Sequence, residues 1–236
     1  MLGILPLSLW AQTPPVIPLS SEPHHHLVYQ NSNVNIYDAK TEPGGSLLLH
    51  RHDNDAVAIA IGDQTVTVGI PGKPDVHSKN PDGQLRMQRA GYVHSTLVEG
   101  NAPYFTVAIE LLHPQTGSRN LCAVVLSGEP LNCPETLPMK TSAYTDQPEY
   151  ESDQTRIRLV RVLPHQTVKI GDGSHPELIV ALDPSEVSTD SPDRLSRKLR
   201  PGDYAWFDRG ATGAAFENKS DKESRYIELT FKTSSN

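Results

Sequence analysis

The feature that most constrains the fold of this 236-residue chain is an internal repeat about half a chain apart. Segment 29–63 lies without a gap over segment 150–184, at a shift of 121 positions (150 − 29). Few aligned residues are identical, but the apolar positions keep phase, as where Leu47 falls on Val168. A fold preserves its pattern of buried positions better than its residue identities. The repeat therefore predicts two copies of one domain.

Short apolar runs predict that both copies are built from strands. The runs are rich in Val and Ile and alternate with turn residues, and the chain contains 20 Pro and 16 Gly. Few segments show a sustained period of 3.6 residues, so an all-β sandwich or barrel is predicted. Both copies close on a similar strand, AIELL at 108–112 and YIELTF at 226–231. Glu110 and Glu228 alternate with apolar residues there, so both are predicted to lie on a solvated or interface face.

Charge and hydropathy exclude two classes of partner. The net charge of -7 argues against nucleic acid, which demands a basic surface. No stretch reaches the roughly 18 apolar residues that are needed to span a bilayer. The N-terminal run MLGILPLSLWAQTPP is typical of the hydrophobic part of a secretory signal. Export to the periplasm or the medium is therefore predicted, with a disordered apolar tail as the alternative.

Changes in composition set the predicted domain boundaries. The predicted units are a signal peptide or tail at 1–22, a first domain at 23–113, a connector at 114–149 and a second domain at 150–236. The connector is rich in Pro, Ser and Thr and is expected to pack against both halves. It contains both cysteines, Cys122 and Cys133. They are predicted to form a disulfide if the protein is exported, and to remain inert thiols in a reducing compartment.

The first copy contains a His-x-His pair with the spacing of metal ligands. His50 and His52 are alternate residues of a predicted strand, so both point to the same face of its sheet. Neutral imidazole is a good ligand for Zn, Fe, Ni, Mn and Cu. His94 follows a Gly-containing turn in RAGYVHSTLVEG, and a later antiparallel strand could bring it opposite the pair.

These segments resemble a known family. PGGSLLLHRHDNDAVAIAIGD and RAGYVHSTL are similar to the two motifs of the cupin superfamily, G-x5-H-x-H-x3–4-E-x6-G and G-x5-P-x-G-x2-H-x3-N. The matching positions are Gly44, His50, His52, Gly62, Gly91 and His94. With the repeat, the whole chain resembles a bicupin. The resemblance implies two tandem jelly-roll β-barrels and one divalent metal (Fe, Mn, Zn or Ni), held inside the first barrel by histidines of both motifs.

The chain departs from the cupin pattern at the motif's glutamate. That residue should stand at position 56 or 57, where the sequence has Ala56 and Val57. Asp53 and Asp55 fall on the face opposite the histidines, whereas Asn54 shares the histidine face. What remains is a three-histidine site with open coordination positions. The alternative is that the histidines are relics that line a polar cavity without a metal.

The second copy lacks this ligand set. At the fixed shift, Gly171 and Gly173 stand over the two histidines, His175 over Asn54 and Glu177 over Ala56, while Gly213 takes the place of His94. One histidine and one carboxylate seldom hold a catalytic metal. The second barrel is therefore predicted to be structural, burying a face of the first barrel or forming a dimer surface.

A further histidine cluster precedes the first domain. His24, His25 and His26 follow a Pro-rich segment and are predicted to be an exposed lead-in to the first strand. The alternatives are an auxiliary metal patch or a sensor of pH.

Two functions remain open from the sequence. The first is a mononuclear metalloenzyme in which His50, His52 and His94 hold the metal that acts on a small polar substrate. The second is a non-catalytic exported protein that binds a small molecule or is structural, and that could be a homodimer. The absent glutamate favours the second, because no catalytic acid or base can be named from the sequence.

Overall fold

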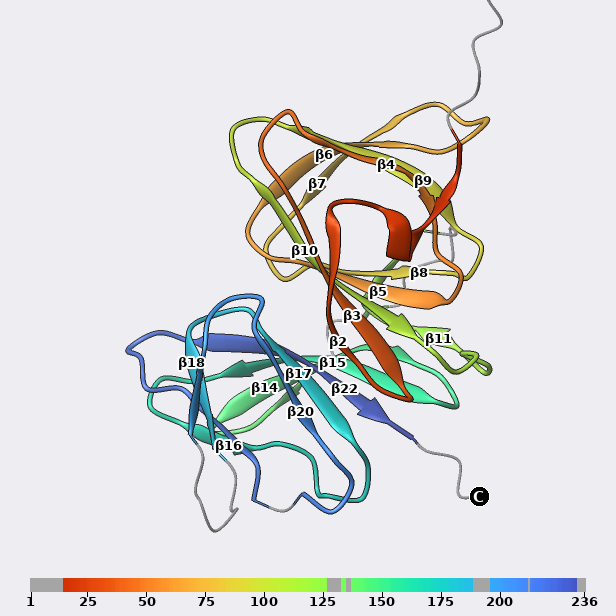
Figure 1. Cartoon of the computed structure of the whole chain (residues 1–236). Helices are drawn as coiled ribbons and strands as arrows, with labels where there is room; N and C mark the ends of the chain where they lie inside the picture. Colours follow the sequence, from red (N-terminus) through yellow and green to blue (C-terminus); the bar gives the residue numbers. More distant parts are fainter. Residues whose placement is uncertain (1–14, 127–132, 135–136, 189–195, 212, 233–236) are drawn as a thin grey trace, which may run out of the picture.

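The computed structural model describes residues 15–126, 133–134, 137–188, 196–211 and 213–232, and this part of the chain is nearly all β (Figure 1). The strands of the first half are β1 (Ile17–Pro18), β2 (His25–Gln30), β3 (Val34–Thr41), β4 (Ser46–Arg51), β5 (Asp55–Ala60), β6 (Gln64–Gly69), β7 (Val76–Asn80), β8 (Leu85–Gln88), β9 (Val93–Glu99) and β10 (Tyr104–Leu111). The connector contains β11 (Arg119–Asn120), β12 (Val124–Val125) and β13 (Met139–Lys140). The second half contains β14 (Tyr144–Glu151), β15 (Thr155–Val162), β16 (Thr167–Lys169), β17 (Glu177–Ala181), β18 (Ser185–Ser188), β19 (Arg197–Leu199), β20 (Tyr204–Phe207), β21 (Ala215–Glu217) and β22 (Ser224–Phe231).

The strands form two barrels, each closed by two sheets. The first barrel pairs a five-stranded sheet, ordered β1-β4-β9-β6-β7, with a six-stranded sheet, ordered β12-β8-β5-β10-β3-β2. The second pairs a larger sheet, ordered β11-β14-β15-β22-β17-β20, with a four-stranded sheet, ordered β16-β21-β18-β19. The predicted all-β class with two tandem barrels is confirmed. Within the described ranges, no helix has the length and apolar character that crossing a membrane requires.

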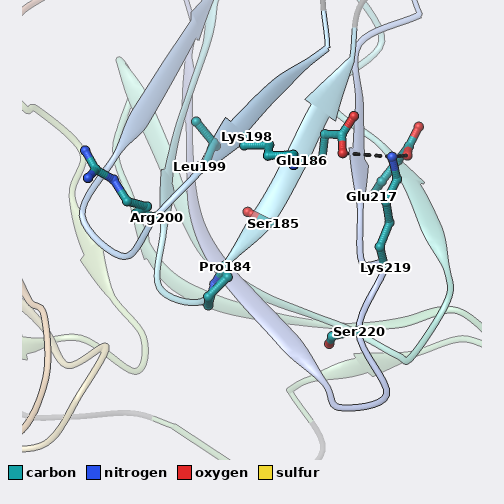
Figure 2. A pocket seen from close by; sticks show the side chains of 9 residues that line it. All are labelled: Pro184, Ser185, Glu186, Lys198, Leu199, Arg200, Glu217, Lys219 and Ser220. Carbon is teal, nitrogen blue, oxygen red and sulfur yellow. Dashed lines mark hydrogen bonds and ion pairs between the residues drawn. The ribbon is translucent and has the colours of Figure 1, made fainter.

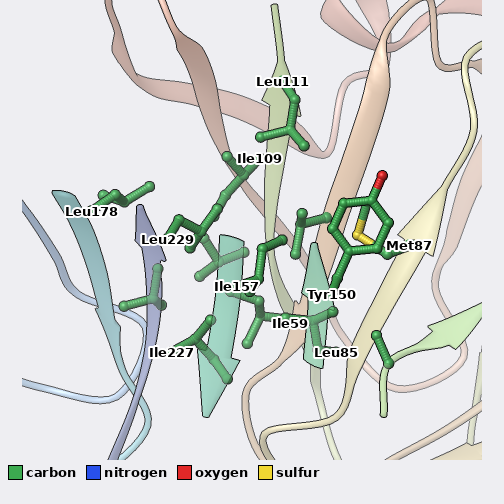
Figure 3. Close-up of a cluster of buried hydrophobic side chains, with 14 of the residues drawn as sticks. Ile59, Leu85, Met87, Ile109, Leu111, Tyr150, Ile157, Leu178, Ile227 and Leu229 are labelled. Carbon is green, nitrogen blue, oxygen red and sulfur yellow. The ribbon is translucent and has the colours of Figure 1, made fainter. Parts of the chain in front are cut away.

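The larger sheets of the two barrels pack against each other through one shared apolar core (Figure 3). Val57 and Ile59 of β5 contribute to it from the first barrel, and Leu178 and Leu229 contribute from the second. The intervening residues of each strand face the inside of their own barrel. Strand β5 is consequently buried along almost its whole length, which is why it reads as a continuous apolar run rather than an alternating one.

The connector pairs with both barrels. Strand β11 pairs with β14 of the second barrel, and β12 pairs in parallel with β8 of the first. Cys122 and Cys133 form a disulfide. The chain contacts both sheets within a few residues, so the connector fixes how the barrels sit relative to each other.

The ends of the predicted units differ from the observed strands. Strand β14 begins at Tyr144, inside the stretch assigned to the connector, and Pro148 lies where its pairing with β15 shifts register. A Pro is tolerated at such an irregularity, so here it did not mark a loop. Ile17 pairs with His50, and Leu19 is buried, although both fell in the predicted tail. The rest of the predicted signal, residues 1–14, lies outside the described residues.

The shared core predicts a large stability cost for a cavity between the barrels. Leu229 is 0% exposed, whereas Leu97 on the outer sheet is 46% exposed. Leu229→Ala should lower the free energy of unfolding by about 2–5 kcal/mol, because it removes buried methyl groups and leaves a void. The matched control Leu97→Ala should change it by no more than about 0.5 kcal/mol. Urea denaturation checks this, and equal losses in the two variants would contradict the core's role.

Candidate metal centre

The three histidines singled out by the sequence meet inside the first barrel. His50 lies on β4, His94 lies directly opposite it on β9, and His52 follows the end of β4. All three are buried, and one ring nitrogen from each lies within 4.8 Å of the others. No further His, Cys, Asp or Glu among the described residues joins this group. The two motifs therefore converge as the resemblance implied.

Local backbone structure sets the direction of these side chains. The pairing of β4 with β9 shifts register between Leu47 and His50, which is a bulge. Leu47 and His50 are both buried although they are three residues apart, because the bulge reverses the alternation once. The His52 N–H donates to Tyr92 O at 2.9 Å, and the Gly91 N–H donates to His52 O at 2.7 Å. Gly91 has a φ of 84°, which fits a glycine at this turn.

The nitrogen atoms have the spacing and protonation that metal binding requires. The Nδ1–H of His50 donates to Leu48 O at 2.8 Å, so Nε2 carries the lone pair; this atom is buried and has no hydrogen-bond partner. The Nε2 atoms of His52 and His94 are 3.1 Å apart. Metal–imidazole bonds of about 2.0–2.2 Å place neighbouring ligands about 3 Å apart. The donor set therefore fits one divalent transition metal.

Burial keeps the three imidazoles neutral. It lowers the pKa of His50 from 6.5 to about 4 and, with the nearby His50 and His25, lowers the pKa of His52 to about 3. Burial and the neighbouring histidines also lower the pKa of His94. A neutral imidazole has a lone pair to donate, so the site is ready for a cation at neutral pH.

A buried Glu–His pair adjoins the cluster, and the sequence did not predict it. Glu22 accepts hydrogen bonds from His25 Nδ1 at 2.7 Å and from the Leu48 N–H at 3.0 Å. Burial raises the pKa of Glu22, but these bonds outweigh burial and lower it to about 2. The His25 ring lies 4.9 Å from that of His50. The prediction of an exposed lead-in is therefore wrong for His25, because it begins β2 and its side chain is buried beside His50.

The sheet that faces the histidines presents small residues flanked by polar ones. Strand registers place two interior rows across it, Arg86–Ala58–Ala108–Tyr37 and Gln88–Ala56–Glu110–Asn35. Residues directly opposite on neighbouring strands share a face. The alanines present only methyl groups to the side of the histidines, and polar side chains flank them in each row.

Arg86 stands out on this wall because its charge is buried. It is 7% exposed, its Nε has no hydrogen-bond partner, and within the described ranges no carboxylate pairs with it. Burial, His50 and His52 are the main causes of the lowered pKa of His94, and the positive charge of Arg86 is the next largest. Arg86 therefore lies close to the histidine cluster. A buried, unpaired guanidinium costs free energy unless an anion binds it.

Glu110 also lies inside the barrel, which overturns its predicted place on a solvated or interface face. It accepts hydrogen bonds from Asn35 Nδ2 at 2.9 Å and from Tyr37 Oη at 3.4 Å. It lies directly opposite Ala56, where the cupin motif has its glutamate. Asn54 also donates to it at 3.5 Å, so its amide is directed to Glu110. The sequence could not predict this, because β10 is buried on both faces and shows no alternation.

The two aspartates near the His-x-His pair stay away from the cluster, as the strand period predicts. Asp53 pairs with Arg51 at the surface, at 2.6 Å. Asp55 accepts the Ala90 N–H at 2.9 Å.

In the second barrel, Lys169 of β16 pairs with Ala215 of the antiparallel strand β21. Gly171 follows Lys169 by two residues, and Gly213 precedes Ala215 by two. They take the places of His50 and His94, so the ligand set is absent there.

A separate groove of about 680 Å³ lies on the outer part of this barrel (Figure 2). Its Lys219 pairs with Glu186 at 2.7 Å and Glu217 at 3.2 Å, so this charge is already neutralised.

Several solved structures are similar to this chain in fold. AerE from Microcystis aeruginosa is 13% identical with a TM-score of 0.62, over 92% of this chain and 97% of that protein. Oxalate decarboxylase of Bacillus subtilis, which has Mn(II) centres, is 14% identical with a TM-score of 0.56, over 95% and 79%. The Lactobacillus farciminis enzyme, solved as a formate complex, is 12% identical with a TM-score of 0.56, over 93% and 86%.

No protein-family model matches the chain, and no curated protein matches it. At these identities the structural similarity establishes the fold. The chain has the cupin fold with a three-histidine cluster in its first barrel.

The lowered pKa values predict an acid-dependent loss of stability in the metal-free protein. The unfolded chain takes up protons on His50 and His52 near pH 6.5, whereas the folded chain does so only near pH 4 and 3. The free energy of unfolding should therefore fall as pH falls from 6.5 to 4.5, by on the order of 1 kcal/mol per pH unit for each imidazole. Urea denaturation in EDTA should show a shallower dependence for His50→Ala/His52→Ala. Identical slopes would mean that these histidines are not buried and neutral.

Proposed function

We propose that this protein is a bicupin that holds one divalent transition metal on His50, His52 and His94 and acts as a metalloenzyme on a small organic acid. The observation that carries the proposal is the convergence of three buried, neutral imidazoles, one of which presents an unpartnered Nε2. An unsatisfied buried polar atom costs about 1–3 kcal/mol. A metal ion on these nitrogens would remove that cost.

The donor set bears on which of the four candidate metals, Fe, Mn, Ni and Zn, the site prefers. Imidazole-only sites suit Fe, Ni and Zn, whereas Mn prefers carboxylate ligands, and the cluster has none. Mn stays among the four candidates because Bacillus subtilis oxalate decarboxylase, with its Mn(II) centres, shares the fold. When bound, the ion supplies Lewis-acid polarisation of a substrate oxygen.

Charge supports an organic acid as substrate. Three neutral ligands leave the positive charge of the ion uncompensated, and Arg86 adds a second buried positive charge close to His94. A guanidinium binds a carboxylate with two parallel hydrogen bonds. Ala56, Ala58 and Ala108 lie on the same wall as Arg86 and present only methyl groups to the barrel interior. Oxalate decarboxylase, named for a small dicarboxylate, is similar in fold.

His25 is the group best placed to move a proton. Its Nδ1 is held by Glu22, so Nε2 is the nitrogen available for transfer, and its ring adjoins His50. A carboxylate that accepts a hydrogen bond from Nδ1 in this way fixes the tautomer and the orientation of the imidazole. Glu22 and His25 thus supply the acid–base pair that the motif lacks.

One observation favours the second candidate, a non-catalytic binding protein. The cluster contains no carboxylate where the cupin motif has its glutamate, because Ala56 occupies that position. Under this alternative, the metal-loaded protein binds organic acids without converting them.

We further propose that the protein is exported, which the disulfide between Cys122 and Cys133 supports. The homodimer stays a prediction.

Metal analysis tests the proposal directly. Untagged protein purified without added metal should contain close to one Fe, Mn, Ni or Zn per chain by plasma mass spectrometry. His50→Ala/His52→Ala should lose it, because two of three ligands are removed. The matched control His77→Ala/His113→Ala removes two exposed histidines and should retain it. Metal-free protein that also refuses all four added metals would leave the binding or structural alternative.

A second experiment tests the substrate class. Oxalate should perturb the electron paramagnetic resonance spectrum of Mn²⁺-loaded protein, a readout that reports on the first barrel alone. Arg86→Met keeps the length of the side chain and removes its charge, so it should raise the oxalate concentration for half-effect at least tenfold. The control Arg51→Met, at an exposed arginine, should leave it unchanged. Equal responses in both variants would exclude Arg86 as the anion site.

A further inference from the structure

The second barrel contains a polar cavity in the place of the histidine cluster. The cavity has a volume of about 430 Å³, within the range of small-molecule sites. The residues that line the cavity include Arg156, Arg158, Lys169, Gly171, His175 and Glu177. Gly171 stands at the repeat position of His50. The cavity therefore opens where the first barrel places its candidate metal ligands.

A reciprocal exchange of residue sizes creates this cavity. The first barrel has His50 and Ala56, and the second has Gly171 and Glu177 at the corresponding positions. A Cβ on Gly171 would lie 2.8 Å from Glu177 Oε1 and 2.9 Å from its Cγ. The glycine is thus required for the Glu177 side chain to lie along this wall. Glu177 is opposite Thr230, which is the register position of Glu110 in the first barrel.

The lining of the cavity contains two cations without an ion-pair partner among the described residues, together with one exposed carboxylate, Asp172. Arg156 and Lys169 are exposed at its mouth, and neither forms an ion pair within the described residues. Arg158 lies deeper, where Asp146 and Glu228 bind its terminal nitrogens at 2.6 and 2.7 Å from behind the cavity wall. Its Nε is buried and has no hydrogen-bond partner.

Glu177 lies on the floor of the cavity as a buried acid with a free oxygen. It is 5% exposed, and its Oε2 has no hydrogen-bond partner. Burial and the negative charge of Glu228 raise the pKa of Glu177 to about 8, so its carboxyl group is protonated at neutral pH. A protonated carboxyl group donates a hydrogen bond. The groups around it are Glu228 and Thr230 of β22, Arg156 and Arg158 of β15, and Tyr144, Lys169, Asp172 and His175 at the cavity wall.

We propose that the second barrel binds a small organic acid without a metal, through the cations of Arg156 and Lys169, with the Glu177 side chain as a hydrogen-bond donor to the ligand. In the described part of the chain, only His50, His52 and His94 gather closely enough to hold a metal ion, so recognition in this cavity rests on charge and hydrogen bonds. The site does not depend on the proposed metal centre of the first barrel.

Calorimetric titration of the full chain tests this site in the His50→Ala/His52→Ala background, which removes the proposed metal centre. The probes are formate, acetate, oxalate, malonate and succinate, with succinamide as an uncharged analogue of succinate. At least one acid should bind at pH 7 and succinamide should not. Adding Arg156→Ala/Lys169→Ala should weaken binding at least tenfold. The matched control Arg197→Ala/Lys198→Ala removes two exposed cations from the same barrel and should not weaken it.

The pH dependence tests the role of Glu177. Above pH 8 its carboxyl group ionises and ceases to donate, so affinity should be about tenfold lower at pH 9 than at pH 7. Glu177→Gln keeps a neutral donor of the same shape, so it should bind at pH 7 and lose this dependence.

Three outcomes would overturn the proposal. They are the absence of binding by all five acids, equal losses in the two double-cation variants, and a tenfold decline at pH 9 that persists in Glu177→Gln.

Discussion

The packing of the two large sheets against each other is the constraint on which the rest of the structure depends. Because Val57, Ile59 and Leu229 are buried between the barrels, their neighbours along each strand must face inward. That assignment directs Arg86 and Glu110 into the first barrel, opposite the histidines. A slip of one residue would exchange the two faces and bury charged side chains in the shared apolar core.

The two barrels show how one backbone plan produces two different interiors. The large side chains of His50 and His94 face small residues in the first barrel, whereas Gly171 and Gly213 leave room for Glu177 in the second. The larger sheet of the second barrel packs against the first barrel, which is one of the two structural roles that the sequence predicts for it. The interior of the second barrel contains a polar cavity, which is a costly filling for a purely structural core.

Residues outside the motifs complete the candidate centre. Glu22 and His25 reach it because the segment that contains them joins β1, which pairs with β4, to β2, which pairs with β3. Arg86 reaches it from β8, whose four residues are all buried and give no alternation that would distinguish one face from the other. Each of these side chains is recognisable only once the strand that presents it has been paired.

The sequence alone determined the all-β class, the two-fold repeat and the three histidines, because strand period and motif spacing are local properties. It left the disulfide conditional on export. Tertiary structure decided which face of each doubly buried strand points inward. It thereby brought Arg86 and Glu110 to the first interior and Glu177 to the second, whereas the pairing of β2 with β3 brought His25, and with it Glu22, to the histidine cluster. The physical reason is that β5, β10 and β17 are covered on both sides, so hydrophobic alternation, the signal that reports facing, is lost. Which face of such a strand points inward is then set by its pairing with strands distant in sequence, and this pairing is seen only in the folded chain.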